Sequence, residues 1–242
     1  ECVSRLKEVS SLIRRETGMT KAQSRIFCNS RFPEKQMAWR CGLGFLGKNS
    51  LIMTPEYGSL GVIGGIFLPF DIPGDDPLEP EPYEQCVSCG LCSSACPAGA
   101  LKGEGGIIKS LCYQYLSTSH EILSEPVMKK WGNILYGCQI CQNVCPFNKN
   151  RSEGLKSELG VLGASLNPVT LLTSTAGEIK DLLRGSVPGA SWIKPAVLKR
   201  NALLCLPRKE KYRELVVEYT RSKDFVLAGT ADFVLKNILE RE

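Results

Sequence analysis

Apolar residues recur at helical spacing at the start of the chain and at strand spacing soon afterwards. Residues 3–16 predict an amphipathic helix because their apolar side chains share one helical face. These side chains are Val3, Leu6, Val9, Leu12 and Ile13. The further elements predicted here are a helix at 34–41 and strands at 24–29, 50–53 and 60–68. We therefore expect an α/β domain over residues 1–70.

The last third of the chain shows helical periodicity only. Pro195 suits a first helical turn, and the apolar residues that follow it share a face that ends near Pro207. This face comprises Val197, Leu198, Ala202, Leu203 and Leu206. A second helix is marked by Leu215, Val216 and Tyr219, and a third by Val226, Leu227, Ala231, Val234, Leu235 and Ile238. Short consecutive helices with tight joins predict a HEAT-like domain over residues 151–242, with an ordinary helical bundle as the alternative.

An acidic, proline-rich stretch separates the α/β domain from the next region. Residues 71–84 contain six acids, four prolines and no base, which predicts an extended connector. The whole chain carries a formal charge of +5, but residues 180–214 alone hold nine bases against three acids, which suits nucleic acid. The bases that favour this interpretation are Lys199, Arg200, Arg208, Lys209, Lys211 and Arg213.

Membrane insertion and export are not expected from this sequence. No stretch approaches the roughly 18 consecutive apolar residues that a membrane helix needs, and the start of the chain shows no export signal. We therefore expect a cytoplasmic protein without a membrane partner.

Two cysteine runs carry the strongest chemical signal. Cys86, Cys89, Cys92, Cys96 and Pro97 form C-x-x-C-x-x-C-x-x-x-C-P, and a second run repeats its later half at Cys138, Cys141, Cys145 and Pro146. In the bacterial form of this run, three thiolates hold one 4Fe-4S cluster and the cysteine before the proline ligates the other. The runs therefore predict a ferredoxin-like domain with two 4Fe-4S clusters over residues 85–150.

The second run supplies three cysteines, so one more ligand is needed, and Cys112 is the nearest candidate. We assign Cys86, Cys89, Cys92 and Cys145 to one cluster, and Cys96, Cys112, Cys138 and Cys141 to the other. The cysteines left over are Cys2, Cys28, Cys41 and Cys205, which we expect in packed apolar positions. Zinc sites usually close with two separated cysteine or histidine pairs, and a chain of 242 residues needs no disulfide framework to stabilise its core.

Histidine chemistry is constrained because His120 is the only histidine. Thr118 and Glu121 around it fit a capping box, so we expect His120 in the first turn of a surface helix. A Cys–His pair or a histidine base is therefore not expected to catalyse a reaction.

Residues 38–51 and 54–59, which read AWRCGLGFLGKNSL and TPEYGS, resemble the signature of the epoxyqueuosine reductases. The two cysteine runs, the segment that begins at Cys112 and the helical tail follow in that family's order. The resemblance covers roughly residues 5–240.

The resemblance implies a cobalamin-dependent oxidoreductase that reduces epoxyqueuosine to queuosine in tRNA. It implies that the corrinoid rests near the glycine-rich segment, at Gly42, Gly44, Gly47, Lys48 and Asn49. Glycines let the backbone approach a large planar ring closely. The fold class expected is α/β plus α+β: a partial cobalamin-binding α/β domain, a ferredoxin-like double-cluster domain and HEAT-like helices. The partners implied are tRNA and an electron donor such as a flavodoxin or a ferredoxin.

The chain departs from the family pattern in two places. The family's catalytic aspartate aligns with Cys28, and a one-residue slip would bring Asn29 there, so the catalytic residue of this chain is unknown. The family also has a substantial region before the point that corresponds to Glu1. These departures leave two other hypotheses open: a non-enzymatic 4Fe-4S protein that transfers electrons to a partner's corrinoid or another acceptor, and a corrinoid reductase of another small substrate, related to the reductive dehalogenases.

Overall fold

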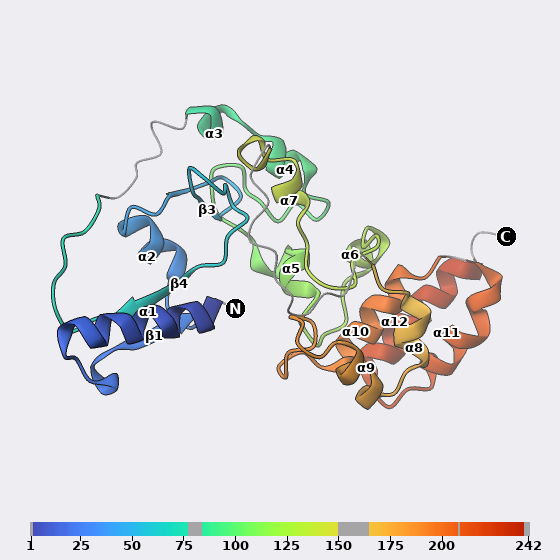
Figure 1. Ribbon diagram of the computed structural model, residues 1–242. Coiled ribbons are helices and arrows are strands. Elements are labelled where there is room, and N and C mark those ends of the chain that lie inside the picture. The colour runs from blue at the N-terminus through green and yellow to red at the C-terminus, as the bar shows by residue number, and fades with distance from the viewer. Residues whose placement is uncertain (1, 77–83, 150–164, 208, 240–242) are drawn as a thin grey trace. The chain divides into compact units, whose positions relative to one another are not determined.

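The computed structural model describes residues 2–76, 84–149, 165–207 and 209–239, which form two compact units (Figure 1). Unit 1 comprises Glu1–Cys96, Leu101–Ile107 and Ile140–Gly154, and unit 2 comprises Pro97–Ala100, Ile108–Gln139 and Leu155–Glu242. The elements of unit 1 are α1 (Cys2–Thr17), η1 (Lys21–Gln23), β1 (Arg25–Cys28), α2 (Glu34–Arg40), β2 (Phe45–Leu46), β3 (Ile52–Met53), β4 (Gly64–Phe67), α3 (Glu84–Ser88), α4 (Leu91–Ala95), α7 (Ile140–Asn143) and η4 (Pro146–Asn148). The elements of unit 2 are η3 (Lys109–Leu111), α5 (Tyr113–Leu116), α6 (Glu125–Lys129), α8 (Pro168–Thr173), α9 (Ala176–Leu182), α10 (Pro195–Cys205), η5 (Glu210–Tyr212), α11 (Arg213–Thr220) and α12 (Phe225–Leu239).

Unit 1 begins with a helix that packs along a two-stranded antiparallel sheet. β1 pairs with β4 from Arg25 opposite Phe67 to Cys28 opposite Gly64, and α1 contacts both strands. The rings of Phe27 and Phe67 lie 4.8 Å apart. The helices predicted for this unit and the strands predicted at 24–29 and 60–68 are confirmed, although β4 is shorter than 60–68.

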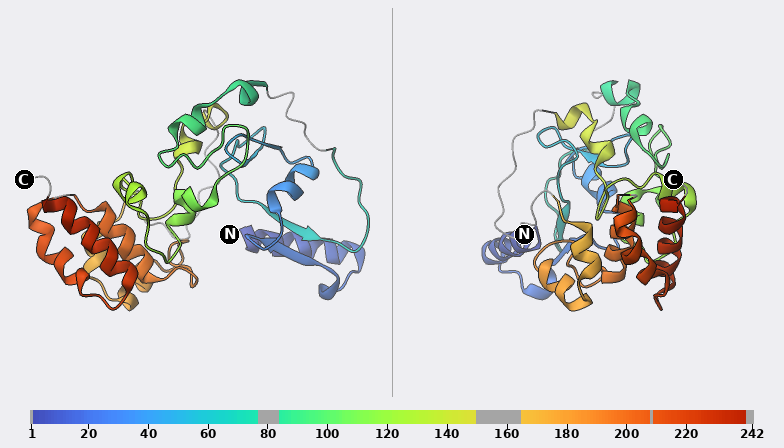
Figure 2. Two further views of the ribbon diagram at one scale, coloured as in Figure 1. Left: turned by 180° about the vertical axis from the view of Figure 1, so that it is seen from behind. Right: turned by 90° about the vertical axis from the view of Figure 1, so that its right-hand side faces the viewer.

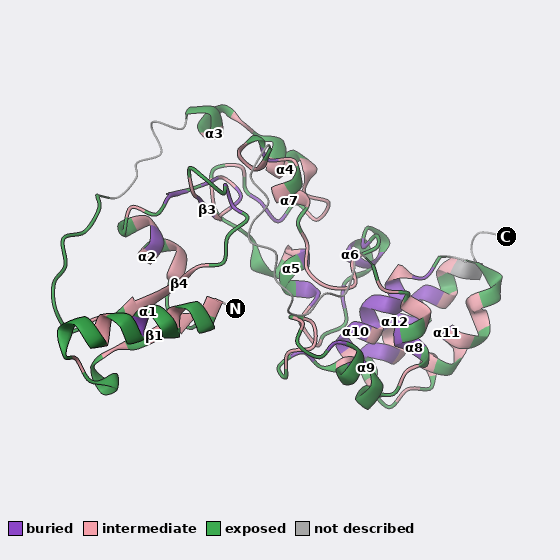
Figure 3. Cartoon of the chain, in the orientation of Figure 1, coloured by how far each residue is buried: buried purple, intermediate pink, exposed green. Residues whose placement is uncertain are grey.

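The predicted apolar face of α1 is only partly buried. Val3, Val9 and Leu12 are 41%, 46% and 49% exposed, while Ser10 is the buried residue of the helix. Figure 3 shows α1 mostly in the colour of exposed residues. The periodicity therefore predicted the helix correctly but not how much of it is covered within the described residues.

A second, very short antiparallel pair brings the glycine-rich segment into place. β2 pairs with β3, with Phe45 opposite Met53 and Leu46 opposite Ile52. The expected strand at 50–53 is thus confirmed over two residues, and its partner strand was not predicted. Phe45, Met53 and Cys145 form a small buried core, against which Phe147 packs.

Unit 2 is helical, and its core is the larger of the two. α10 contacts α8 and α12, and α11 contacts α12, so these helices lie side by side (Figure 2). The predicted face of α10 is buried throughout, and α10 ends at Cys205, close to the predicted end. The third predicted helix corresponds to α12, although the side chain of Ile238 lies outside the described residues. The HEAT-like comparison stays a prediction.

Two polar residues lie at the centre of this helical core. Arg200 and Asn201 are both 0% exposed. The Arg200 guanidinium donates to the carbonyls of Glu121 and Leu116 and to the Asn201 side-chain oxygen. Placing Arg200 on a surface that binds nucleic acid was therefore wrong, because its charge is buried among backbone carbonyls.

The predicted helix start at His120 is also wrong. His120 lies between α5 and α6, outside any helix, and its Nε2 pairs with Asp224 Oδ2 at 2.8 Å. Burial alone raises the pKa of the Asp224 carboxyl, but the hydrogen bonds from His120, Leu227 and Val226 hold it below its ordinary value. In place of the predicted cap, the His120 side chain makes this long-range contact with Asp224. No helix among the described residues is both long and apolar enough to span a membrane.

Candidate metal centre

Three cysteines of the first run lie on a tight helix–turn–helix segment of unit 1. Cys86 lies in α3, Cys92 lies in α4, and Cys89 lies in the turn between them. The Cys89 N–H donates to the Cys86 carbonyl at 3.3 Å, which closes the turn. Because residues three apart share one side of such turns, the three thiols converge on one side of the segment.

Cys145 joins this group from the second run. It follows α7, and α7 packs against α4. The side chains of Cys86, Cys89, Cys92 and Cys145 line one cavity, which contains about 330 Å³ of unfilled space, part of it open to solvent. The structure therefore brings together the four thiols assigned to the first cluster.

The lining of this cavity is otherwise mostly apolar. Met53, Leu91, Pro146 and Phe147 contribute to it. Burial raises the pKa of the Cys145 thiol, and the neighbouring Cys86 and Cys92 act in the same direction, while the N–H groups of Phe147 and Asn148 oppose them. A bound metal accepts the charge of a desolvated thiol and so favours its ionised form. This donor set therefore fits an iron–sulfur cluster.

The arrangement differs from that of a mononuclear metal site. Within the described ranges, no three histidine, cysteine, aspartate or glutamate side chains are grouped closely enough to hold one metal ion. A cluster of iron and sulfide separates its thiolates more widely than a single zinc ion does.

The second assigned set is divided between the two units. Cys96 ends α4 and Cys141 lies in α7, both in unit 1. In unit 2, Cys112 caps α5, and the Cys138 N–H donates to the side-chain oxygen of Gln114 in the same helix at 3.0 Å. Each unit therefore contains two of the four cysteines. The assignment of all four to one cluster stays a prediction.

The core of unit 2 supports its pair of cysteines. The Gly137 N–H donates to Ser117 Oγ at 3.0 Å. Asn201 Nδ2 in turn donates to the carbonyls of Ser117 and Leu135, at 2.9 and 2.8 Å. The α10 helix thus fixes both the end of α5 and the loop that leads to Cys138.

The glycines of the glycine-rich segment face other parts of the same chain. A Cβ on Gly44 would lie 2.2 Å from the Met53 carbonyl oxygen, and one on Gly42 would lie 2.7 Å from Asp76 O. Gly42 also has φ of +65°, which disfavours other residues there. Gly44 therefore permits the close β2–β3 pairing. A role for these glycines toward a corrinoid stays a prediction.

Lys48 and Asn49 face the cysteines. Lys48 Nζ donates to the carbonyls of Val87 and Cys89, at 2.8 and 3.0 Å. Asn49 is 3% exposed, and its Oδ1 accepts the Leu51 N–H at 3.1 Å. Both side chains line the cavity that contains the four thiols. The sequence identified these two residues but not this contact with the cysteine-bearing turn.

A second hollow in unit 1 adjoins the first. It contains about 750 Å³ of unfilled space, open solvent included, and Lys48 and Cys86 line both hollows. The rest of its lining is Phe45, Leu46, Val87, Gly103, Glu104 and Gly105. Of the five residues assigned to the corrinoid, Lys48 is the one that lines this hollow.

The positions aligned with the family's aspartate lie at the end of β1. Burial and the neighbouring Cys2 raise the pKa of the Cys28 thiol to about 11, so Cys28 is protonated at neutral pH. The backbone N–H groups of Asn29 and Ser30 donate to the Glu34 carboxylate, at 3.1 and 2.6 Å. Among the cysteines outside the two ligand sets, Cys41 is exposed, which corrects the expectation of a packed position.

Comparisons with known proteins agree with this geometry. A family model described as a 4Fe-4S double cluster binding domain matches residues 85–148. The epoxyqueuosine reductase of Listeria monocytogenes is 32% identical over 213 residues, which cover 85% of this chain and 54% of that protein. The Bacillus subtilis enzyme is 35% identical over 175 residues, which cover 72% and 44%. The chain therefore spans about half the length of the curated relatives that it matches.

Solved structures give the same match. The structure of epoxyqueuosine reductase from Streptococcus thermophilus has a TM-score of 0.85 at 24% identity, and the match covers 100% of this chain and 64% of that one. A crystal structure of epoxyqueuosine reductase with an epoxyqueuosine-modified tRNA-Tyr stem loop has a TM-score of 0.79 at 27% identity, covering 99% and 67%.

Proposed function

Because the chain belongs to the epoxyqueuosine reductase family, we propose that it is an iron–sulfur and cobalamin-dependent oxidoreductase that converts epoxyqueuosine to queuosine in tRNA. The observation that carries this proposal is the convergence of Cys86, Cys89, Cys92 and Cys145 on one cavity, within the segment that matches a double-cluster domain. The reaction consumes two electrons and two protons, and the epoxide oxygen leaves as water. The clusters transfer these electrons one at a time.

Two 4Fe-4S clusters are the proposed cofactors. Cys86, Cys89, Cys92 and Cys145 hold the first, and Cys96, Cys112, Cys138 and Cys141 hold the second. Lys48 supports the first set because its ammonium group binds the carbonyls of Val87 and Cys89. A cation next to a cluster also favours the more negative, reduced state. A flavodoxin or a ferredoxin is the proposed electron donor, and the cytoplasm, which keeps thiols reduced, is the proposed location.

Cobalamin is the proposed second cofactor, and when bound it supplies a reducible cobalt for opening the epoxide. The second hollow favours a site near Lys48, because Lys48 and Cys86 line both this hollow and the cluster cavity. Gly42, Gly44, Gly47 and Asn49 would shape the segment that carries Lys48. The glycine Cβ positions are occupied by atoms of this chain, so these residues act on the shape of the segment.

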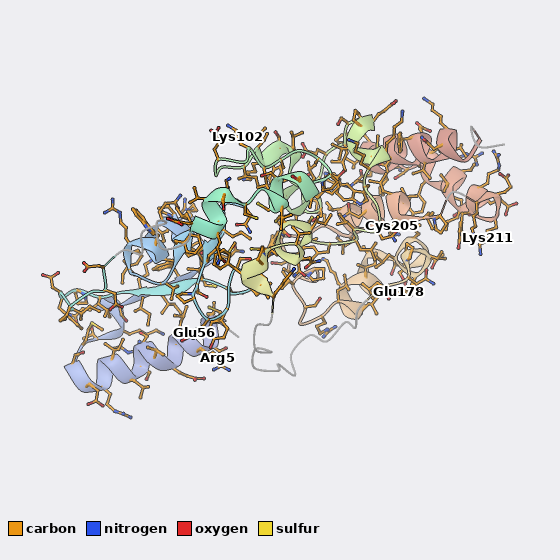
Figure 4. All side chains as sticks on the ribbon, turned by 90° about the horizontal axis from the view of Figure 1, so that it is seen from above. Arg5, Glu56, Lys102, Glu178, Cys205 and Lys211 are labelled. Atoms are coloured by element: carbon orange, nitrogen blue, oxygen red, sulfur yellow. The ribbon has the colours of Figure 1, made fainter. Side chains whose placement is uncertain are left out.

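The proposed substrate partner is tRNA. In unit 2, Lys209 and Lys211 are exposed, and Lys211 is labelled in Figure 4. Lys199 instead binds the Leu172 carbonyl and the Tyr219 hydroxyl. Arg213 pairs with Glu210, and Arg208 lies outside the described residues. Of the six bases named for this interpretation, Lys209 and Lys211 are therefore the two that we propose to contact phosphate. Binding should weaken log-linearly with salt.

One observation favours the alternative of a non-enzymatic electron-transfer protein. The close packing of Gly42 and Gly44 against their own chain is a structural reason for these glycines that requires no corrinoid. Anaerobic addition of cobalamin separates the two functions. A change in the visible spectrum of the bound cobalamin supports the reductase, and an unchanged spectrum supports the electron carrier.

The decisive experiment combines iron analysis with a cellular assay. After anaerobic reconstitution, the protein should bind about eight irons, and Cys145→Ser should lose about half of them. Cys41→Ser is the matched control, because Cys41 is exposed and outside both ligand sets, and it should retain all the iron. Expression in a strain that lacks epoxyqueuosine reductase should restore queuosine in tRNA. A protein that binds no iron, or whose iron does not respond to Cys145→Ser, would contradict the proposal.

A further inference from the structure

The Asn49 side chain has a buried donor without a partner in the cavity of the four thiols. Asn49 is 3% exposed, and its Nδ2 has no hydrogen-bond partner. Among the described residues, Ser93 Oγ is the other buried side-chain atom in this condition, and Ser93 does not line the cavity. Leaving such a donor unpaired costs about 1–3 kcal/mol, so an unpaired atom of this kind calls for a ligand.

The orientation of the amide follows from its other end. Oδ1 accepts the Leu51 N–H at 3.1 Å, and an N–H group cannot take its place there. Gly47 makes room for this oxygen, because a Cβ at Gly47 would lie 3.1 Å from it. The Nδ2 atom is therefore the end of the amide that can donate a hydrogen bond into the cavity.

The neighbours of Asn49 hold it in this position. Lys48 is tied to the carbonyls of Val87 and Cys89. Ser50 has a φ of +62°, its N–H donates to Gly47 O at 2.9 Å, and its Oγ accepts the Gly106 N–H at 2.9 Å. Asn49 is thus fixed from both sides, and small movements of the segment would not bring Nδ2 to solvent.

The remaining lining of the cavity limits the acceptors that Nδ2 can find. Met53, Leu91, Pro146 and Phe147 present apolar side chains there, and the other contributors include the four cysteine thiols. The carbonyls of Val87 and Cys89 already accept the Lys48 ammonium. Gln85, which is exposed, contributes the one other side-chain acceptor among the lining residues. The four sulfur atoms are therefore the main acceptors that the cavity offers.

On the basis of the cluster ligation proposed above, we propose that Asn49 Nδ2–H donates a hydrogen bond to a sulfur atom of the cluster held by Cys86, Cys89, Cys92 and Cys145. This bond is stronger when the cluster gains an electron, because the sulfur atoms then carry more negative charge. Asn49 is therefore a positioning residue that raises the reduction potential of this cluster.

Redox titration followed by electron paramagnetic resonance tests this role. Asn49→Leu removes the donor, together with the acceptor of the Leu51 N–H, and keeps a side chain of the same branched shape. At the potential where this cluster is half reduced in the wild-type protein, its ratio of reduced to oxidised form should fall about tenfold, which corresponds to about 59 mV for a one-electron couple. The second cluster should keep its potential and so serves as an internal reference.

Asn49→Asp keeps the acceptor for Leu51 and replaces the donor by a carboxylate, so it should lower the same potential by at least as much. Asn143→Asp is the matched control, because Asn143 is exposed and lies two residues from both Cys141 and Cys145 in the sequence. It introduces the same charge in water and should leave both potentials nearly unchanged. Unchanged potentials in Asn49→Leu would overturn the proposal.

A measurement on the wild-type protein covers the case in which a variant does not assemble its clusters. Isotopic labelling of asparagine nitrogen should produce a hyperfine coupling to one reduced cluster in pulsed paramagnetic resonance. Absence of this coupling in a protein that holds both clusters would refute the role of Asn49 alone. A wild-type protein without clusters would instead contradict the proposed function.

Discussion

Replacing Arg200 by methionine should destabilise unit 2 strongly. Arg200 is fully buried, and burial lowers the pKa of its guanidinium to about 10, with the Glu121 carboxylate acting in the opposite direction. It is therefore still charged at neutral pH. It donates to two backbone carbonyls and to Asn201, and its Cζ lies 5.6 Å from the centre of the Trp131 ring.

The magnitude follows from what methionine cannot replace. A hydrogen bond to a charged group contributes about 1.5–3 kcal/mol, and an acceptor left unpaired in the core costs about 1–3 kcal/mol. Methionine fills most of the volume and avoids burying a charge, which offsets part of this loss. We expect the free energy of unfolding to fall by about 3–5 kcal/mol.

Urea unfolding followed by tryptophan fluorescence measures this loss. Trp131 is 1% exposed and lies beside Arg200, so its emission reports on this core. Arg221→Met is the matched control because Arg221 is exposed, and it should change the free energy by less than about 0.5 kcal/mol. A loss below about 1 kcal/mol for Arg200→Met would refute the view that this buried charge organises the core.

Two further predictions concern a backbone contact and an ion pair. Gly44→Ala places a Cβ 2.2 Å from the Met53 carbonyl oxygen, so it should lower the free energy of unfolding by roughly 3 kcal/mol. Gly61→Ala is the control, because the space around Gly61 is open, and it should be neutral in the same unfolding assay. Equal effects of the two substitutions would contradict the steric reasoning. The folded pKa of Asp224 is lowered, so its stabilisation is present above its ordinary pKa of about 3.9 and is lost as the pH falls through the folded value. Asp224→Asn should therefore flatten the fall of stability below about pH 4 in unfolding measured across pH, and an unaltered acid limb would argue against the His120 pair.

The sequence predicted the elements whose signal is local. Spacing alone grouped Cys86, Cys89 and Cys92, which line one cavity in the structure, and helical periodicity identified α10 together with its buried face. The strand β2 was missed because two residues contain no period, and it exists only through pairing with β3.

Long-range contacts explain what the sequence did not predict. His120 lies outside any helix, and its side chain binds Asp224, more than a hundred residues later, a contact that local sequence does not reveal. The sequence pattern grouped Arg200 with surface bases, but its guanidinium group donates to the backbone carbonyls of residues 116 and 121 in the core. Within the glycine-rich segment, the family resemblance indicated Lys48 and Asn49, but only the structure shows that they line the cavity of the cysteines.

The separation of Cys145 from the other three cavity thiols has a consequence for biosynthesis. During translation, the sulfurs of residues 86, 89 and 92 leave the ribosome about fifty codons ahead of the fourth. A nascent chain thus exposes an incomplete thiol triplet to oxidants and competing metals until the later segment emerges. For the cluster ligation proposed above, all four thiols of this cavity become available to iron only after that later segment has emerged.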